Sequence, residues 1–409
     1  MRIVVLCPHF DPDTAPTGHV ISRIVVELAS RGHDVHVATA LPWYRDHALA
    51  PGWTGRLVRV QRTDWGSVTR VTPFPGGDRR NLPRRALGYV GFSLLVGIAG
   101  LRAGGWFRRA DAVIAMSPPL TLGLTGWAAK LAHRAPLVFN IQDVFPDAAV
   151  ETGAITDRRV IAVARWLERV SYRRADAVTV LSTDMADNVS AKIAPRHRPK
   201  VRVIPNFVDT AALHPSDRVT PYRRQLAIGD EPVVMYAGNV GFSQSLEMVI
   251  AAARAIPGAT FVINGQGAAR PQLEAAAAGL ANIRFGDHQP ADRLNEVLAT
   301  GDIHLVPLRR GLGRVSVPSK TYSILAAGRP VVAAIDVDSE VNRIVTTTGC
   351  GVVVAPDDTQ AFIEAIRAVL GTSDIGAEMG RAGRAWVESS ASPASTAAAY
   401  EALFAELAT

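Results

Sequence analysis

The stretch VPSKTYSILAAGRPVV, residues 317–332, predicts a short helix that leads into a strand. Pro318 suits the entry to a helix, Ser319 is able to cap it, and Gly328 is a natural helix stop. Lys320 falls in the first helical turn, where the positive end of the helix dipole also favours an anion. The stretch therefore predicts an anion site in an α/β chain. The alternative is a core helix whose lysine is solvated.

Strand-like and helix-like segments alternate on both sides of this stretch. The strands are expected at residues 3–6, 35–39, 112–115, 137–141, 177–181, 201–204, 233–236, 260–263, 303–306, 331–334 and 351–354. The longer helical patterns occupy residues 20–31, 158–173, 246–255, 271–278 and 359–370. Such alternation predicts parallel sheets with right-handed crossovers, and the strands are too many for one ordinary sheet. The predicted fold class is therefore α/β, with two doubly wound Rossmann-like domains.

A Pro-Asn turn at Pro205 and Asn206 ends the strand before it and marks the expected domain boundary. We expect a first domain over residues 1–205 and a second over residues 206–389. An Ala-rich amphipathic helix over residues 390–409 is expected to pack back on the first domain. Ligand sites of such domains lie in the loops that follow strands.

The bulk composition narrows the function classes. The 409 residues carry a formal charge of +7, which favours an acidic partner. The two cysteines exclude a disulfide framework and a multi-cysteine metal site, and they indicate a reducing, cytoplasmic compartment. The opening residues lack the long apolar stretch of a signal peptide. P-loop, zincin and esterase motifs are absent, which excludes those enzyme classes. The arginines lie near glycine loops rather than on a basic face with aromatic residues, so a nucleic-acid partner is not expected.

Residues 86–101 form an uncharged apolar segment between two groups of arginines. The flanking residues are Arg79, Arg80, Arg84 and Arg85 before it, and Arg102, Arg108 and Arg109 after it. The segment is shorter than the roughly 20 residues that span a bilayer. A helix with basic flanks is able to lie in a membrane interface, and we favour this interpretation. The alternative is a buried helix with solvated arginines.

Four candidates for substrate contact lie in or beside loops that follow strands of the first domain. Gly18, in the loop after the first strand, permits close approach of the backbone to a ligand. His9 and His19 flank this loop and are candidates for substrate contact, with turn or capping histidines as the alternative. Asp143 follows a later strand and is able to bind a hydroxyl or stabilise developing positive charge, unless it caps a turn.

The second domain carries two glycine loops and a basic loop. Gly238 opens the first loop, in which Ser243 or Ser245 is able to cap the next helix. Gly265 and Gly267 end the following strand. The basic loop contains Arg309, Arg310 and Arg314. Because guanidinium groups match phosphate geometry, these arginines and Lys320 are predicted to clamp a diphosphate. The DxD spacings at Asp11–Asp13 and Asp336–Asp338 lack further metal ligands.

Taken together, these motifs resemble glycosyltransferase family 4, whose members have the GT-B fold. The likeness is to bacterial surface-polysaccharide enzymes of the WbuB and WcaI type. It covers about residues 1–390. The motifs that carry it are residues 16–18, 141–146, 204–209, 236–241, 265–267 and 318–330.

The resemblance implies retaining, metal-independent transfer of a sugar from a nucleotide-diphosphate donor, UDP- or GDP-linked. The acceptor would be a glycan, a lipid-linked sugar or a glycolipid at the inner face of the cell membrane. The donor would bind mainly in the second domain and the acceptor mainly in the first, with a cleft between them. No cofactor is implied.

The resemblance also implies residue roles. Lys320 and Arg314 would neutralise the leaving diphosphate, and Asp143 would face the acceptor or the sugar. His9 and His19 would contact the acceptor. The residues implied for the nucleotide sugar are Gly18, Gly238, Asn239, Gln244, Gly265, Gln266, Gly267, Arg309, Arg310, Ser319 and Ser323.

Two features depart from the broad family. Its two glutamates, eight positions apart, align with Val315 and Ser323, and its usual Arg and Lys of the first glycine loop align with Asn239 and Gln244. Two alternatives therefore stay open. One is a non-hydrolysing nucleotide-sugar epimerase that uses Glu340 and His288, and the other is a catalytically silent nucleotide-sugar-binding protein.

Overall fold

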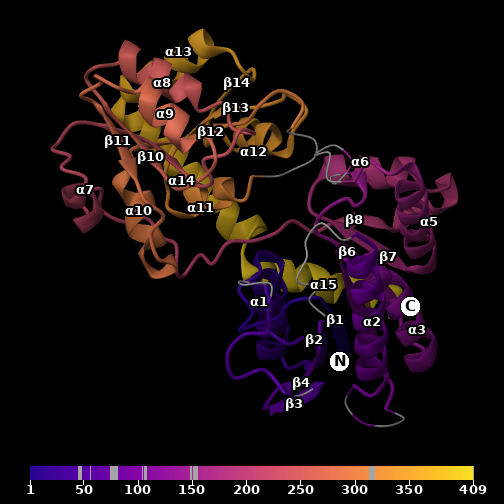
Figure 1. Cartoon of the computed structure of the whole chain (residues 1–409). Coiled ribbons are helices and arrows are strands. Elements are labelled where there is room, and N and C mark those ends of the chain that lie inside the picture. The colour runs from indigo at the N-terminus through magenta and orange to yellow at the C-terminus, as the bar shows by residue number, and fades with distance from the viewer. Residues whose placement is uncertain are drawn as a thin grey trace. The chain divides into compact units, whose positions relative to one another are not determined.

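The computed structural model describes residues 1–44, 48–55, 57–73, 82–103, 105, 108–147, 150, 155–312 and 318–408 (Figure 1). The chain forms two compact units, each with its own sheet. The first unit contains residues 1–205 and 396–409, and the second contains residues 206–395. We describe each unit by itself.

The sheet of the first unit has eight strands in the order β3-β4-β2-β1-β5-β6-β7-β8. Its strands are β1 (Arg2–Leu6), β2 (Asp34–Ala40), β3 (Val58–Thr63), β4 (Gly66–Val71), β5 (Ala112–Ser117), β6 (Leu137–Ile141), β7 (Ala177–Val180) and β8 (Val201–Val203). Only β3 is antiparallel to its neighbour. In the parallel centre, Val5 of β1 lies opposite Val37 of β2 and Ile114 of β5, and all three are buried.

The hairpin of β3 and β4 was not predicted. Most of β3 is exposed at the sheet edge and carries Arg59 and Arg62, so it lacks the apolar run of the central strands. An edge strand needs no continuous hydrophobic sequence, because one side of it faces water.

The helices of the first unit cover both faces of this sheet. They are α1 (Pro16–Ser30), α2 (Leu82–Leu101), α3 (Thr121–His133), α5 (Arg158–Arg174), α6 (Thr183–Ala191), the 3-10 turn Pro195–Lys200, and α15 (Pro393–Ala408), of which the part from Thr396 onward belongs to this unit. At the start of α5 the Asp157 carboxylate accepts hydrogen bonds from the backbone N–H groups of Arg159 and Val160. This cap is the expected device for a helix start.

The apolar segment of residues 86–101 lies in α2, and its described side chains divide between two environments. Phe92 and Val96 are buried in the core of the first unit, whereas Leu94 and Ile98 are exposed. One face of this helix is therefore part of the core and the other is open to solvent, so the choice between the two interpretations stays open. Among the described residues no helix has the length and apolar character needed to cross a membrane.

The C-terminal helix α15 packs in the first unit. The Asn140 side chain donates a hydrogen bond to the Tyr400 hydroxyl at 2.7 Å, and Arg31 pairs with Glu401 at 2.8 Å. The preceding helix α14 (Ser373–Ser390) belongs to the second unit, which extends to Ser395 rather than to the expected residue 389.

The second unit has a six-stranded parallel sheet in the order β11-β10-β9-β12-β13-β14. The strands are β9 (Val233–Ala237), β10 (Thr260–Asn264), β11 (Ile283–Gly286), β12 (Ile303–Pro307), β13 (Val331–Ala334) and β14 (Gly351–Val354). The helices are α7 (Pro221–Gln225), α8 (Glu247–Ala255), α9 (Arg270–Ala276), the 3-10 turn Ala291–Arg293, α10 (Leu294–Thr300), α11 (Lys320–Ala326), α12 (Glu340–Thr348), α13 (Thr359–Leu370) and α14. Of the strands, only β11 was not predicted.

Two expected helix caps are wrong. Ser319 precedes α11 with helical backbone angles and makes no side-chain capping bond. The Ser245 hydroxyl donates instead to the Asp357 carboxylate at 2.6 Å, and α8 begins at Glu247 without a side-chain cap. By contrast, Gly328 ends α11 as predicted, with a φ of +67° that favours glycine.

Candidate functional site

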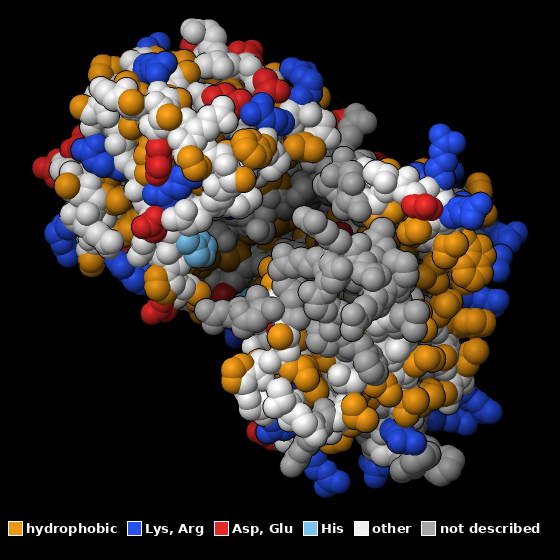
Figure 2. Space-filling view, viewed as in Figure 1, with side chains coloured by type: hydrophobic (Ala, Val, Ile, Leu, Met, Phe, Trp, Pro, Cys, Tyr) orange, Lys and Arg blue, Asp and Glu red, His pale blue; other side chains and the backbone are white. Residues whose placement is uncertain are grey.

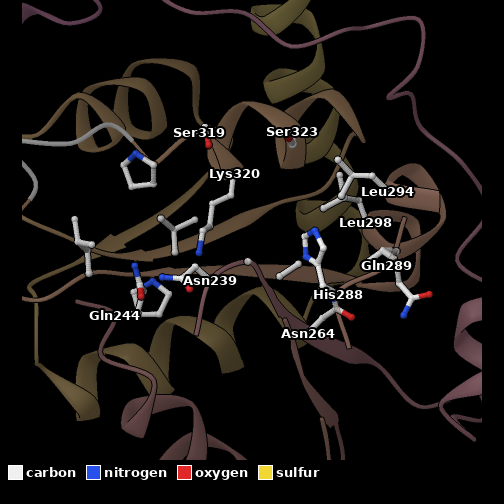
Figure 3. A pocket seen from close by; sticks show the side chains of 17 residues that line it. Asn239, Gln244, Asn264, His288, Gln289, Leu294, Leu298, Ser319, Lys320 and Ser323 are labelled. Carbon is white, nitrogen blue, oxygen red and sulfur yellow. The ribbon is translucent and has the colours of Figure 1, made fainter. Parts of the chain in front are cut away.

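A pocket of about 460 Å³ opens at the carboxyl ends of β9, β10 and β12 (Figure 3). Parallel α/β sheets present their ligand sites at this edge. The pocket is lined by Ala237, Gly238, Asn239, Gln244, Asn264, His288, Gln289, Leu294, Val297, Leu298, Val306, Pro307, Leu308, Pro318, Ser319, Lys320 and Ser323. Six of the predicted site residues are in this set: Gly238, Asn239, Gln244, Ser319, Lys320 and Ser323.

Lys320 supplies the positive charge of this pocket. Its Nζ lies 3.8 Å from the centroid of the Tyr236 ring, a cation–π distance. Burial lowers the pKa of Lys320 to about 7, and no carboxylate within the described ranges pairs with it. A bound anion would restore the charged form. The helix that Lys320 begins, α11, has only seven residues.

The glycines of the two loops make room for neighbouring protein atoms. A Cβ at Gly238, where φ is +147°, would lie 2.9 Å from Nζ of Lys320. A Cβ at Gly265 would overlap the carbonyl oxygen of Gly238, and one at Gly267 would overlap that of Val240. Gly265 and Gly267 therefore serve the packing of one loop on the other. Neither lines the pocket, and their contact with the ligand stays a prediction.

Uncharged polar groups surround Lys320 at one end of the pocket. Figure 3 shows the Asn239 and Gln244 side chains on the side of Nζ, where the Gln244 amide oxygen accepts a hydrogen bond from the Gly241 N–H at 3.2 Å. Gln266 was expected beside them, but its amide donates to the Asp287 carboxylate at 2.7 Å outside the pocket.

At the opposite end of the pocket, sequence reasoning named only His288, as a residue of the epimerase alternative. Figure 3 shows His288 and Gln289 there, together with the apolar side chains of Leu294 and Leu298. The first two follow β11, the strand that was not predicted. This strand could have been predicted, because residues Ile283–Gly286 combine a β-branched residue, an aromatic residue and a terminal glycine.

The predicted arginine clamp is not assembled by the described residues. The guanidinium of Arg309 donates to the Phe242 carbonyl at 2.7 Å and pairs with Glu247 at 2.8 Å. Arg310 donates to the Pro356 carbonyl at 3.2 Å. Neither lines the pocket, because both are held by the loops beside it. Arg314 lies outside the described residues.

The acidic residues of the epimerase alternative and of the second DxD spacing contact other groups of the protein. Glu340 pairs with Arg343 at 3.0 Å and does not line the pocket, so an epimerase pairing with His288 is not formed. The Asp336 carboxylate accepts a hydrogen bond from the Gly311 N–H at 2.9 Å.

In the first unit, the loop after β1 brings together a histidine, a carboxylate and two aromatic rings. Nδ1 of His9 lies 2.6 Å from a carboxylate oxygen of the buried Asp13. The His9 ring stacks on Trp43 at 5.7 Å and meets Tyr44 edge-on at 5.3 Å between ring centroids. A Cβ at Gly18 would lie 2.8 Å from the His9 Cβ. The absence of a side chain at Gly18 therefore lets the loop pack closely on His9, and the contact of Gly18 with the donor stays a prediction.

The other two predicted residues of the first unit lie apart from this cluster. His19 is exposed on α1. Asp143 is exposed directly after β6, and its carboxylate makes no hydrogen bond within the described part of the chain. It is therefore accessible to a ligand at the carboxyl edge of the sheet.

Comparisons with known proteins add independent findings. Residues 17–206 match the family model described as a glycosyl transferase 4-like domain, and residues 231–372 match that of glycosyl transferases group 1. WcaI of Escherichia coli K12, a glycosyl transferase assigned to colanic acid biosynthesis, is 29% identical over 360 residues, which are 85% of this chain and 86% of WcaI. WbjE of Pseudomonas aeruginosa, also named as a glycosyltransferase, is 27% identical over 67% of this chain and 69% of its own length.

Solved structures share the fold over the whole chain. Sucrose-phosphate synthase of Thermosynechococcus elongatus superposes with a TM-score of 0.75 at 17% identity, covering 100% of this chain and 99% of its own. HepE of Anabaena, solved in complex with UDP-glucose, superposes with a TM-score of 0.66 at 15% identity and covers 100% of both chains.

Proposed function

This chain belongs to the GT-B glycosyltransferases of the WcaI type, and on that premise we propose that it transfers a sugar from a nucleotide-diphosphate donor to a glycan, lipid-linked or glycolipid acceptor. The observation that carries the proposal is the pocket of the second unit, where Lys320 stands among neutral polar groups at the carboxyl ends of parallel strands. Its volume of about 460 Å³ lies in the usual range for small-ligand sites.

The two ends of the pocket suit the two ends of a nucleotide sugar. The diphosphate would bind at Lys320, with Asn239 and Gln244 as neutral hydrogen-bonding groups. The nucleoside would lie at the other end, between the polar groups of His288 and Gln289 and the apolar wall that includes Leu294. The UDP-glucose complex of HepE supports a UDP-linked donor, and a GDP-linked donor is the alternative.

The chemistry proposed for this pocket needs no metal ion. As the bond between sugar and diphosphate breaks, negative charge develops on the departing phosphate oxygen, and a lysine next to it stabilises that charge. We propose that Lys320 has this role and that the transfer retains the configuration at the anomeric carbon. Arg314, outside the described residues, is proposed as a second cation.

The acceptor is proposed to bind in the first unit. Nδ1 of His9 faces Asp13, and Nε2 has no hydrogen-bond partner within the described ranges. Nε2 is therefore available to an acceptor hydroxyl, while Trp43 beside it offers an apolar ring face to a sugar. The exposed carboxylate of Asp143 is proposed to bind the acceptor or the transferring sugar. His19, exposed on α1, is proposed as a further acceptor contact.

A basic and apolar surface on the first unit supports contact with the inner face of the cell membrane. We call it the membrane face; its exposed apolar side chains are Val90, Leu94, Ile98 and Leu101 of α2, Leu131 of α3, and Val160, Val163 and Trp166 of α5. Exposed arginines lie among them on α5: Arg158, Arg159, Arg165, Arg169, Arg173 and Arg174. Figure 2 shows hydrophobic and basic side chains interspersed over the region that carries α3 and α5 in Figure 1. Apolar side chains with arginines suit an anionic lipid surface.

A thermal-shift screen with UDP-, GDP- and dTDP-sugars tests the donor proposal. The preferred donor is then incubated with the protein, with and without lipid-linked and glycan acceptors. The expected result is release of nucleoside diphosphate that requires an acceptor. Isomerisation of the donor without acceptor would indicate an epimerase, and binding without turnover under every condition would contradict the proposed transfer.

A further inference from the structure

Two arginines of the β3–β4 hairpin gather around one tryptophan in the first unit. The Cζ atoms of Arg59 and Arg70 lie 4.4 and 5.3 Å from the ring centroid of Trp53. Neither guanidinium has a carboxylate partner among the described residues. We call these three residues the arginine cluster.

Arg70 is the less usual member, because its charge is buried and forms no ion pair with a described carboxylate. Only 3% of its surface is exposed, and its guanidinium donates to two uncharged oxygens, the Gln61 amide at 3.3 Å and the backbone carbonyl of Asp11. Its Nε is buried with no hydrogen-bond partner. Burial lowers the pKa of Arg70, and the charge of Arg59 acts in the same direction, while Cys7 and the Asp11 carboxylate oppose this shift. Buried charges in folded proteins are ordinarily paired, whereas no carboxylate of the described residues lies within ion-pair distance of this guanidinium.

A small pocket adjoins the arginine cluster. It has a volume of about 250 Å³ and is lined by Leu41, Gly52, Trp53, Thr54 and Arg59. The Arg59 side chain is exposed, so its N–H groups are able to reach a ligand that enters from solvent. A guanidinium is able to donate two parallel hydrogen bonds to a pair of oxygens of a phosphate or carboxylate group.

The cluster also touches the loop proposed to bind the acceptor. Arg70 donates to the carbonyl of Asp11 and lies 6.0 Å from the Phe10 ring, and both residues fall between His9 and Asp13. A ligand at the arginine cluster would therefore lie beside the paired His9 and Asp13, at the same edge of the sheet.

We propose that the pocket beside the arginine cluster binds an acidic group of the acceptor, either a phosphate or a sugar carboxylate. Arg59 donates hydrogen bonds to this group, and Arg70 supplies a second, permanent positive charge from beneath Trp53. That the acid belongs to an acceptor rests on the proposed function, whereas binding of a free acid at this pocket does not.

Fluorine NMR of the full chain labelled with 5-fluorotryptophan tests the site directly. The Trp53→Phe variant identifies the Trp53 resonance, and excess UDP is present throughout to occupy the pocket of the second unit. Inorganic phosphate, glucuronate and uncharged glucose are titrated separately. We expect the Trp53 resonance to shift saturably with an acid and not with glucose. In Arg59→Gln the apparent Kd should rise at least tenfold, whereas Arg62→Gln, on the same exposed strand but outside the pocket, should leave it unchanged.

The separate titrations distinguish the two possible sources of the acidic group. A response to phosphate alone supports a phosphate-bearing, lipid-linked acceptor, and a response to glucuronate alone supports an acidic glycan. No shift with either acid, or an equal shift in Arg59→Gln, would overturn the site. If Trp53 responds as expected and no donor or acceptor gives sugar transfer, the proposed function fails while the acid site stands.

Discussion

The two units handle positive charge in opposite ways. The pocket of the second unit holds one lysine, partly buried among neutral groups and lowered in pKa to about 7. The first unit carries arginines, in the arginine cluster and on the membrane face. A lysine is able to release its proton when a site is empty, whereas an arginine stays charged. The difference predicts that donor binding depends on pH and that membrane binding depends on salt.

The largest effect should come from the lysine. We expect Lys320→Ala to lower turnover about 100-fold or more, because the leaving diphosphate loses its counter-charge in the transition state. Initial rates of nucleoside diphosphate release measure this. Arg309→Ala is the matched control, because Arg309 is paired with Glu247 outside the pocket, and it should change the rate less than about threefold. An unchanged rate in Lys320→Ala would remove that residue from the mechanism.

A methyl group at Gly238 should disturb the same lysine without removing it. We expect Gly238→Ala to raise the donor KM about tenfold or more, because its Cβ would lie 2.9 Å from Nζ of Lys320 and its φ of +147° is strained for alanine. Gly258→Ala, with no atom within 4 Å of its new Cβ, is the control in the same unit. Thermal unfolding of both variants separates lost binding from lost folding. Equal KM values in the two variants would contradict this account of the loop.

The pH dependence of donor binding should sharpen the comparison further. Free Lys320 loses its proton near pH 7, whereas a bound diphosphate would hold the proton in place. Binding therefore takes up a proton above pH 7 and weakens as the pH rises. Affinity for a nucleotide sugar should fall about tenfold between pH 6 and pH 8.

Isothermal titration across this pH range measures the effect, and titration in buffers of different ionisation enthalpy reports the proton directly. Lys320→Arg, which stays charged, should bind with little pH dependence. A pH-independent wild type, or a variant with the same slope as the wild type, would exclude the lysine as the titrating group.

The smallest effect is expected at the membrane face. Leu94→Ser with Ile98→Ser should lower the fraction of protein that sediments with anionic liposomes several-fold, because each exposed aliphatic side chain contributes about 1–2 kcal/mol when it leaves water. The control, Val26→Ser with Val219→Ser, alters two exposed valines outside this face. Leu95 is unsuitable for this test, because it packs against the core.

Raising the salt concentration should release the wild type further, since the arginines contribute through charge. Donor binding should stay intact in the Leu94→Ser and Ile98→Ser protein. Equal sedimentation of the variant and its control would exclude α2 as a membrane contact.

The central strands and the long amphipathic helices were predictable, because buried parallel strands carry continuous apolar runs and helices carry a 3.6-residue period. The hairpin of β3 and β4 was not, because an exposed edge lacks such a run. Within the candidate site, Gly238 was predictable from its place after a strand, and Lys320 from its place in the first turn of a helix. Arg309 was not, because its choice between the pocket and the Phe242 carbonyl depends on the path of its loop.

By itself, the sequence determined the α/β class, the break near Pro205 and the lysine of the second unit, because these depend on local pattern and on short motifs. Only the tertiary structure decided what these residues contact. It placed Lys320 over Tyr236 and brought His288 and Leu294 into the same pocket. It also left Arg70 buried, with an Nε that has no hydrogen-bond partner among the described residues. Burial and pairing are set by atoms far apart in the chain, and no local pattern records which of them meet.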